Sequence, residues 1–175
     1  MDGSGSGGGA WVLLTYHLPR EPSTPRIAVW RQLRRLGVAQ LADGLVALPA
    51  DARTREAMDR TADRVRAAGG TAGVWLARPG AADQERELAR GLREARAEEY
   101  RGIAARASAA VGTPEERRRA AERLRAELRR VRRRDFFPPP EREAAVAAVE
   151  ALAAGGTGVA PGTARAALAR VEGTA

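Results

Sequence analysis

The stretch that decides the fold is Val38-Ala39-Gln40-Leu41-Ala42-Asp43-Gly44-Leu45-Val46-Ala47-Leu48-Pro49. Two short apolar runs lie on either side of the dipeptide Asp43-Gly44. Asp-Gly favours a two-residue hairpin turn, because glycine supplies positive φ and the aspartate side chain mimics a backbone acceptor. These residues predict two antiparallel strands, and the turn explains Asp43 without a metal or an acid–base role.

The segments before the hairpin predict a strand and then a helix. Residues 11–16, Trp-Val-Leu-Leu-Thr-Tyr, form a continuous apolar run that is typical of a buried central strand. A helix is expected to start at Thr24-Pro25 and to end at Gly37. Its apolar arc consists of Ile27, Val29, Trp30, Leu33 and Leu36, with Arg31, Arg34 and Arg35 on the opposite side.

The segments after the hairpin predict a helix and then a strand. A helix is expected from Asp51 to Ala68, with Met58, Ala62 and Val65 on its apolar stripe, and a last strand over residues 71–77. The order β-α-β-β-α-β predicts a ferredoxin-like sandwich, an antiparallel sheet with both helices on one face. We expect Trp30 and Trp75 in its core and Trp11 at a strand edge.

The second half of the chain predicts helices only, so the fold class is α+β: a ferredoxin-like βαββαβ sandwich followed by an all-helical C-terminal half of about three helices. These helices are expected over residues 84–111, from Thr113 to about Arg134, and over 141–154. The run Phe136-Phe137-Pro138-Pro139-Pro140 breaks the chain before the last helix, and we expect it to dock the helical half onto the sheet. The predicted domains are a disordered Gly/Ser tail (1–10), a ferredoxin-like domain (11–80), a helical extension packed on it (81–154) and a flexible C-terminal tail (155–175).

Composition excludes several classes of function. The 175 residues contain no cysteine, which excludes disulfides, thiolate catalysis and cysteine-ligated metals. There is no phosphate-cradling glycine loop after a strand and no visible catalytic pair, so we expect a non-enzymatic protein without a cofactor. No apolar run reaches 18 residues and the N-terminus does not resemble a signal peptide, so we expect a cytoplasmic protein without a membrane partner.

The net charge of +8 is concentrated in one helix. Residues 115–135 hold ten arginines against five acids, and such a surface favours a polyanion, because arginine binds phosphate bidentately and releases counterions. The alternative is a solvated face on which glutamates three or four residues away neutralise the arginines. The candidate nucleic-acid or anion contacts are Arg118, Arg125, Arg129, Arg132 and Arg133, with Arg31 and Arg35 as a second patch.

His17 is the single histidine and follows the first strand directly, where ligand-binding groups often lie. It is therefore a candidate ligand-edge residue. The alternative is a structural histidine, because one histidine without cysteine or a second histidine does not make a usual transition-metal site. The sequence predicts no metal site.

Three motifs resemble the N-terminal domain of the bacterial chromate-resistance regulator ChrB. They are the helix motif over residues 26–37 (Arg-x-x-x-Trp-Arg-x-Leu-x-x-Leu-Gly), the hairpin Asp43-Gly44-x-x-x-Leu48-Pro49, and Asp135-Phe136-Phe137-Pro138 after an arginine-rich helix. The resemblance covers about residues 11–154. It implies a DNA-binding transcriptional regulator of a chromate-efflux operon, and we expect a homodimer.

Two other functions stay open at this point. One is a sensor of small oxyanions such as chromate or sulfate, since arginine forks suit tetrahedral dianions. The other is a non-catalytic protein-interaction adaptor. Fuller members of the family carry a further C-terminal domain, which we expect this chain to lack; if chromate sensing belongs to that domain, this chain would bind DNA without responding to chromate.

Overall fold

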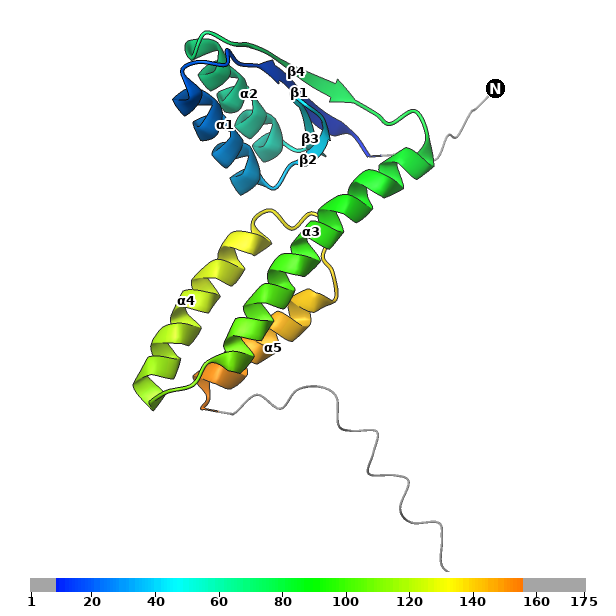
Figure 1. Ribbon diagram of the computed structural model, residues 1–175. Coiled ribbons are helices and arrows are strands. Elements are labelled where there is room, and N and C mark those ends of the chain that lie inside the picture. The colour runs from blue at the N-terminus through cyan, green and yellow to red at the C-terminus, as the bar shows by residue number, and fades with distance from the viewer. Residues whose placement is uncertain (1–8, 156–175) are drawn as a thin grey trace, which may run out of the picture. The chain divides into compact units, whose positions relative to one another are not determined.

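The computed structural model describes residues 9–155, so most of the two predicted tails, residues 1–8 and 156–175, lie outside the described residues. Four strands form one antiparallel sheet in the order β2-β3-β1-β4, built from β1 (Trp11–His17), β2 (Ala39–Ala42), β3 (Leu45–Pro49) and β4 (Thr71–Ala77). Helices α1 (Ser23–Leu36) and α2 (Ala52–Ala67) lie on the same side of this sheet (Figure 1). The predicted ferredoxin-like βαββαβ order is confirmed.

The two faces of the sheet carry different cores. Val12 and Leu14 of β1 are fully buried and pack with Val29 of α1 and Met58 of α2. Side chains alternate along a strand, so Trp11 and Leu13 point to the other face. There they pack with Phe137 and with the first part of helix α3, including Leu92.

The hairpin and the start of α2 follow the predicted local chemistry. Gly44 has φ 71°, the left-handed conformation expected in the turn between β2 and β3. Asp51 caps α2 through a capping box, in which its side chain accepts from the Thr54 N–H and the Thr54 hydroxyl accepts from the Asp51 N–H. Met58, Ala62 and Val65 are buried as predicted.

Helix α1 begins earlier than predicted. It starts at Ser23 with Pro22 at the N-cap and has no side-chain cap, so the expectation that Thr24 caps it was wrong. Pro22 is in an extended conformation, which lets the next residue begin the helix. The end was predicted correctly, because Gly37 adopts φ 72° and donates its N–H to the carbonyl groups of Leu33 and Arg34.

The predicted burial of the three tryptophans was wrong. Trp30 is 50% exposed and Trp75 is 59% exposed, whereas Trp11 is only 2% exposed. Trp11 belongs to a central strand and stacks on Phe137 at a centroid distance of 6.3 Å. Trp75 belongs to an edge strand, and α1 buries only the narrower strip that contains Val29 and Leu33.

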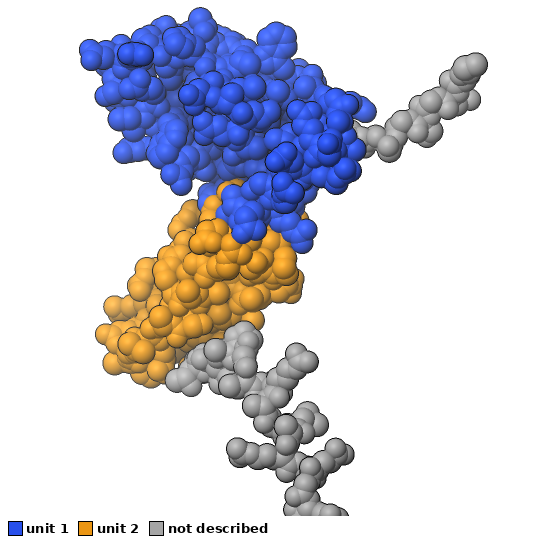
Figure 2. Space-filling model, turned by 45° about the vertical axis from the view of Figure 1, so that its right-hand side comes forward, with its two compact units in different colours: residues 1–95, 134–137 blue, residues 96–133, 138–175 orange. Residues whose placement is uncertain are grey.

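The described residues form two compact units (Figure 2): residues 9–95 with 134–137, and residues 96–133 with 138–155. Helix α3 (Ala82–Ala109) contributes to both, and α4 (Pro114–Arg132) and α5 (Glu141–Ala153) belong to the second. About three helices in this half of the chain is therefore confirmed. The predicted domain limits of residues 80 and 154 stay predictions.

The core of the second unit is built from α3, α4 and α5. Tyr100 and Ile103 of α3 are fully buried and pack with Leu128 of α4 and Val149 of α5. Among the helices of residues 9–155, none combines the length and the apolar character that crossing a bilayer requires.

Candidate nucleic-acid interface

Helix α4 is a strongly capped helix with one apolar side. Thr113 accepts a hydrogen bond from the Glu116 N–H, Glu116 accepts one from the Thr113 N–H at 2.8 Å, and Pro114 occupies the first turn. Ala121, Leu124, Leu128 and Val131 are buried in the core of the second unit. The remaining positions are dominated by arginine, and the core contacts turn them toward solvent.

Three predicted contact residues on α4 are exposed and have no carboxylate partner within residues 9–155. They are Arg118, Arg129 and Arg132. Steps of eleven and three residues correspond to about three turns and one turn of an α-helix, so the three arginines lie on one side of α4. Glu122 lies on the same side and lowers the local positive charge. We call Arg118, Arg129 and Arg132 the α4 arginine row.

Arg125 also lies on this side, but the fold engages it. Its Nε donates to Glu150 Oε1 of α5 at 3.0 Å, and its second nitrogen bonds the other carboxylate oxygen. The hydrogen bonds from Arg125 lower the pKa of Glu150, and the same bonds raise the pKa of Arg125. The pair ties α4 to α5, so Arg125 is less available to a phosphate than its neighbours.

Arg133 is the C-cap residue of α4 and is exposed. It has an interaction partner within the structure, so it does not belong to the unpaired set. Of the five predicted α4 contacts, three therefore have no partner among residues 9–155 and two are engaged there.

The opposite side of α4 holds two arginines that the sequence analysis did not select. Arg123 and Arg130 are exposed and line an open groove of about 570 Å³ between α3 and α4. Arg106 of α3 lies in the same groove and donates two hydrogen bonds, of 2.7 and 2.9 Å, to Glu127. The seven-residue spacing of Arg123 and Arg130 places them on one side of the helix, and this spacing could have identified them from the sequence.

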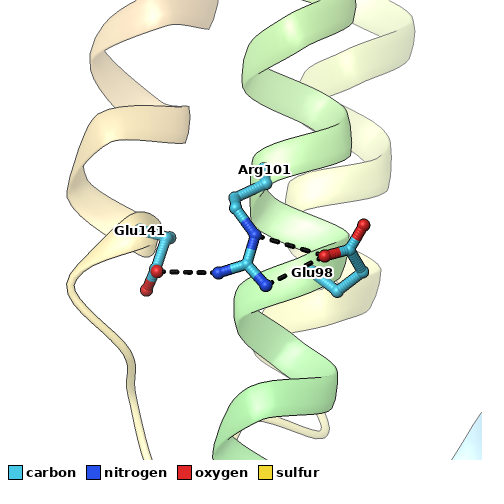
Figure 3. A network of polar contacts seen from close by, with 3 residues as sticks. All are labelled: Glu98, Arg101 and Glu141. Atoms are coloured by element: carbon cyan, nitrogen blue, oxygen red, sulfur yellow. Dashed lines mark hydrogen bonds and ion pairs between the residues drawn. The ribbon is translucent and has the colours of Figure 1, made fainter.

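Other arginines of the second unit hold its helices together. Arg101 of α3 contacts Glu98 at 2.9 Å and Glu141 of α5 at 2.9 Å (Figure 3). On α4, Arg119 pairs with Glu115 one turn earlier. These ion pairs show that only part of the arginine-rich composition is available for a partner.

The second predicted patch lies on α1, in the first unit. Arg31 and Arg35 are both exposed. The neighbouring Arg34 lies over the exposed ring of Trp30 at 4.9 Å from its centroid, an arrangement that favours cation–π attraction. Arg134 donates to the backbone carbonyl oxygen of Arg35 at 3.4 Å. This bond does not involve the Arg35 guanidinium.

His17 is exposed at the last position of β1, opposite Thr71 of β4. Within residues 9–155, no group of three or more histidine, cysteine, aspartate or glutamate residues is arranged to hold a metal ion. His17 therefore stays a candidate ligand-edge residue, at the exposed end of β1.

Comparison with known proteins identifies the first part of the chain. The family model for the N-terminal domain of protein ChrB matches residues 26–110. Over 134 residues the chain is 32% identical to Protein ChrB of Cupriavidus metallidurans, and the alignment covers 74% of this chain and 41% of that relative. The chain thus spans less than half the length of this relative. No solved structure shows a significant match. The matched range runs from within α1 to just past the end of α3 and contains both the α1 motif and the hairpin, so residues 26–110 of the chain form a ChrB N-terminal domain.

Proposed function

We propose that this protein is a chromate-resistance transcriptional regulator that binds DNA through the α4 arginine row. Two independent observations support the proposal: the match of residues 26–110 to the ChrB N-terminal domain, and three exposed arginines on one side of α4 that have no carboxylate partner within residues 9–155. The second observation carries the argument for DNA. The protein would act by binding and not by catalysis, without a cofactor, in the bacterial cytoplasm.

The arginine row suits phosphate contacts better than base contacts. Guanidinium groups form charge-assisted, bidentate hydrogen bonds with phosphate oxygens. Buried Leu124 and Leu128 hold α4 against its core, so little backbone conformational entropy would be lost on binding. Phosphate contacts position a protein on the duplex but do not read its sequence. Operator choice would then depend on DNA shape, on a ligand or on further contacts, with Arg31 and Arg35 of α1 as the second predicted patch.

The test is the salt dependence of binding to the duplex upstream of the protein's own gene, measured by fluorescence anisotropy. Each lost phosphate contact reduces the slope of log K against log salt by about 0.9, so the triple variant R118A/R129A/R132A is expected to lower it by about 2.7. A matched control removes the same charge from the first unit: Arg55, Arg86 and Arg93 are exposed and have no ion-pair partner within residues 9–155. Equal slopes for the two triple variants would reject α4 as the contact surface.

A second candidate function is a sensor of small oxyanions, and the groove between α3 and α4 favours it. Arg106, Arg123 and Arg130 line this groove, although Glu127 already neutralises Arg106. The start of α4 is a poor anion site, because the capping box uses the Glu116 N–H and places its carboxylate there. Calorimetry with chromate and sulfate tests the groove: heat that disappears in R123A/R130A supports it, and no heat at millimolar ligand rejects it.

A further inference from the structure

The two edges of the sheet differ in how open they are to another strand. β2 has only four residues, and its register with β3 shifts between Gln40 and Ala42. Short length and irregular register protect an edge strand from pairing with another chain. β4 forms the other edge (Figure 1) and has seven residues, Thr-Ala-Gly-Val-Trp-Leu-Ala, paired with β1 in continuous register. It contains no charge and no proline, so it lacks the usual protection.

Two large apolar side chains of β4 are also exposed to solvent. Trp75 is 59% exposed and Leu76 is 58% exposed. Neighbouring side chains of a strand point to opposite faces, so the pair marks both faces of this edge. Both residues pair with β1, yet this pairing leaves more than half of each side chain exposed to solvent.

Trp75 is fixed in position although it is exposed. Its indole Nε1–H donates to the Thr15 hydroxyl at 3.2 Å, across the strand pair. The ring lies over Gly73, where an added Cβ would approach Trp75 Nε1 to 2.9 Å. A partner that packs on Trp75 would therefore lose little side-chain entropy in ordering it.

The backbone bonding pattern shows which peptide groups of β4 face outward. The Tyr16 N–H donates to the Gly44 carbonyl at 2.7 Å on the β3 side of β1, and backbone groups alternate in direction along a strand. Thr15 therefore bonds toward its β4 partner Gly73, and Trp75 bonds toward β1 in the same way. Ala72, Val74 and Leu76 face outward, and Arg66 accordingly reaches the Ala72 carbonyl at 3.0 Å.

We propose that β4 is a dimer interface, at which a second copy of this chain adds its own β4 antiparallel, with the two-fold axis at Trp75. Val74 then exchanges both backbone hydrogen bonds with Leu76 of the second copy, and Leu76 does so with Val74 of the second copy. Trp75 faces Trp75 of the second copy at a non-hydrogen-bonded position, where side chains approach most closely. The pairing joins two four-stranded sheets into one.

The edge itself, and not the net charge of the chain, favours a second copy, because β4 carries no charged residue that would select an acidic or a basic partner strand. The chain carries a net charge of +8, so two copies repel each other over most of their surface. β4 is an uncharged strand, and Arg66, which covers its first outward carbonyl, is already paired with Asp63 at 2.9 Å. An antiparallel edge is also self-complementary, as a two-fold interface requires. Arg78, the first charged residue after the strand, lies outside the five residues from Gly73 to Ala77 that pair across the axis.

Sedimentation velocity on the full chain without DNA tests this inference separately from DNA binding. Leu76→Arg places a charge on an exposed position of the edge and is expected to give a monomer, whereas the unaltered chain is a dimer. Val111→Arg is the matched control, because Val111 is 90% exposed in the loop between α3 and α4, and it is expected to leave the dimer intact. A monomeric unaltered chain, or a dimer that survives Leu76→Arg, would overturn the proposal.

Disulfide trapping tests the register, since the chain has no cysteine of its own. Facing residues at a non-hydrogen-bonded position have Cα atoms about 4.5 Å apart, which a disulfide spans. Trp75→Cys is therefore expected to form a covalent dimer under mild oxidation. Leu76→Cys faces Val74 of the second copy and Val111→Cys lies elsewhere, so neither is expected to cross-link with itself. Cross-linking of either control as fast as Trp75→Cys would contradict the register.

Discussion

Arg125 and Arg129 lie one turn apart on α4 and provide a sharp comparison within the proposed DNA interface. Arg125 is held by Glu150 through two hydrogen bonds, whereas Arg129 is exposed and has no carboxylate partner within residues 9–155. Both alanine variants remove one positive charge from the same helix. We expect Arg129→Ala to weaken DNA binding and Arg125→Ala to change it little, because only Arg129 is available to a phosphate.

The size of the effect follows from counterion release. Loss of one phosphate contact reduces the slope of log K against log salt by about 0.9, so between 50 and 200 mM salt the Arg129→Ala variant should lose about 3.5-fold less affinity than the unaltered protein. Glu150→Gln should act in the opposite direction, because it releases Arg125 and permits one more contact. Its slope is expected to become steeper by about the same amount.

Fluorescence anisotropy titrations at four or more salt concentrations measure these slopes, and circular dichroism checks that each variant keeps its helices. The Arg125–Glu150 pair is exposed to solvent, so its loss should stabilise or destabilise the fold only slightly. Equal slopes for Arg125→Ala and Arg129→Ala would show that ion pairing within the fold does not decide which arginines bind DNA. A slope for Glu150→Gln that equals that of the unaltered protein would refute the same reasoning.

Two further predictions concern the stability of each unit. Gly70→Ala should destabilise the first unit by about 3 kcal/mol, because the new Cβ would lie 2.3 Å from the His17 carbonyl oxygen. At Gly69 an added Cβ meets no atom within 4 Å, so Gly69→Ala should destabilise the unit by only about 1 kcal/mol, owing to the φ of 77°. Urea unfolding followed by tryptophan fluorescence reports this unit, since all three tryptophans belong to it, and a larger loss for Gly69→Ala would contradict the steric argument. In the second unit, hydrogen bonds from Thr113 lower the pKa of Glu116 below 4.5, so its contribution is present above pH 4.5 and is lost as the pH falls through the lowered value. Glu116→Gln should therefore reduce the pH dependence of helix content in acid, measured by circular dichroism, and an unchanged dependence would exclude the capping carboxylate as its source.

Local chemistry was sufficient to predict the elements of the fold. Asp43-Gly44 specified the hairpin, Gly37 the end of α1, and Thr113-Pro114 the start of α4, because each acts through its own backbone and its nearest neighbours. The start of α1 was predicted two residues late, since Thr24 is a good capping residue by type but makes no capping bond here. Boundaries set by a side chain's actual partner are less predictable than those set by glycine or proline.

Burial of the tryptophans depended on strand order and not on hydropathy. The pattern around Trp75 is as apolar as that around Trp11, but β4 lies at the edge of the sheet and β1 lies in its centre. The predicted ferredoxin-like topology already implies an edge position for the last strand. The exposure of Trp75 could therefore have been inferred from the fold, although not from the residues of the strand alone.

The sequence identified the helix that carries the candidate site, but not which of its arginines are free of ion pairs within residues 9–155. Charge counting located the excess on residues 115–135, and helical spacing could have identified the Arg119–Glu115 pair. Spacing also places Glu122 one turn from Arg118, yet the two do not pair. The partner of Arg125 is 25 residues away, on another helix. Which arginines stay available is thus a property of tertiary packing, which a pattern within one helix does not contain.

The two proposed surfaces belong to different units, and this separation has a consequence for DNA binding. The α4 arginine row lies in the second unit and the β4 edge lies in the first. A phosphate surface with three available arginines is weak and nonspecific by itself. A dimer joined through β4 would carry two such rows, and the second row would bind at the effective concentration set by the first. Dimerisation would then raise affinity without any new contact to DNA.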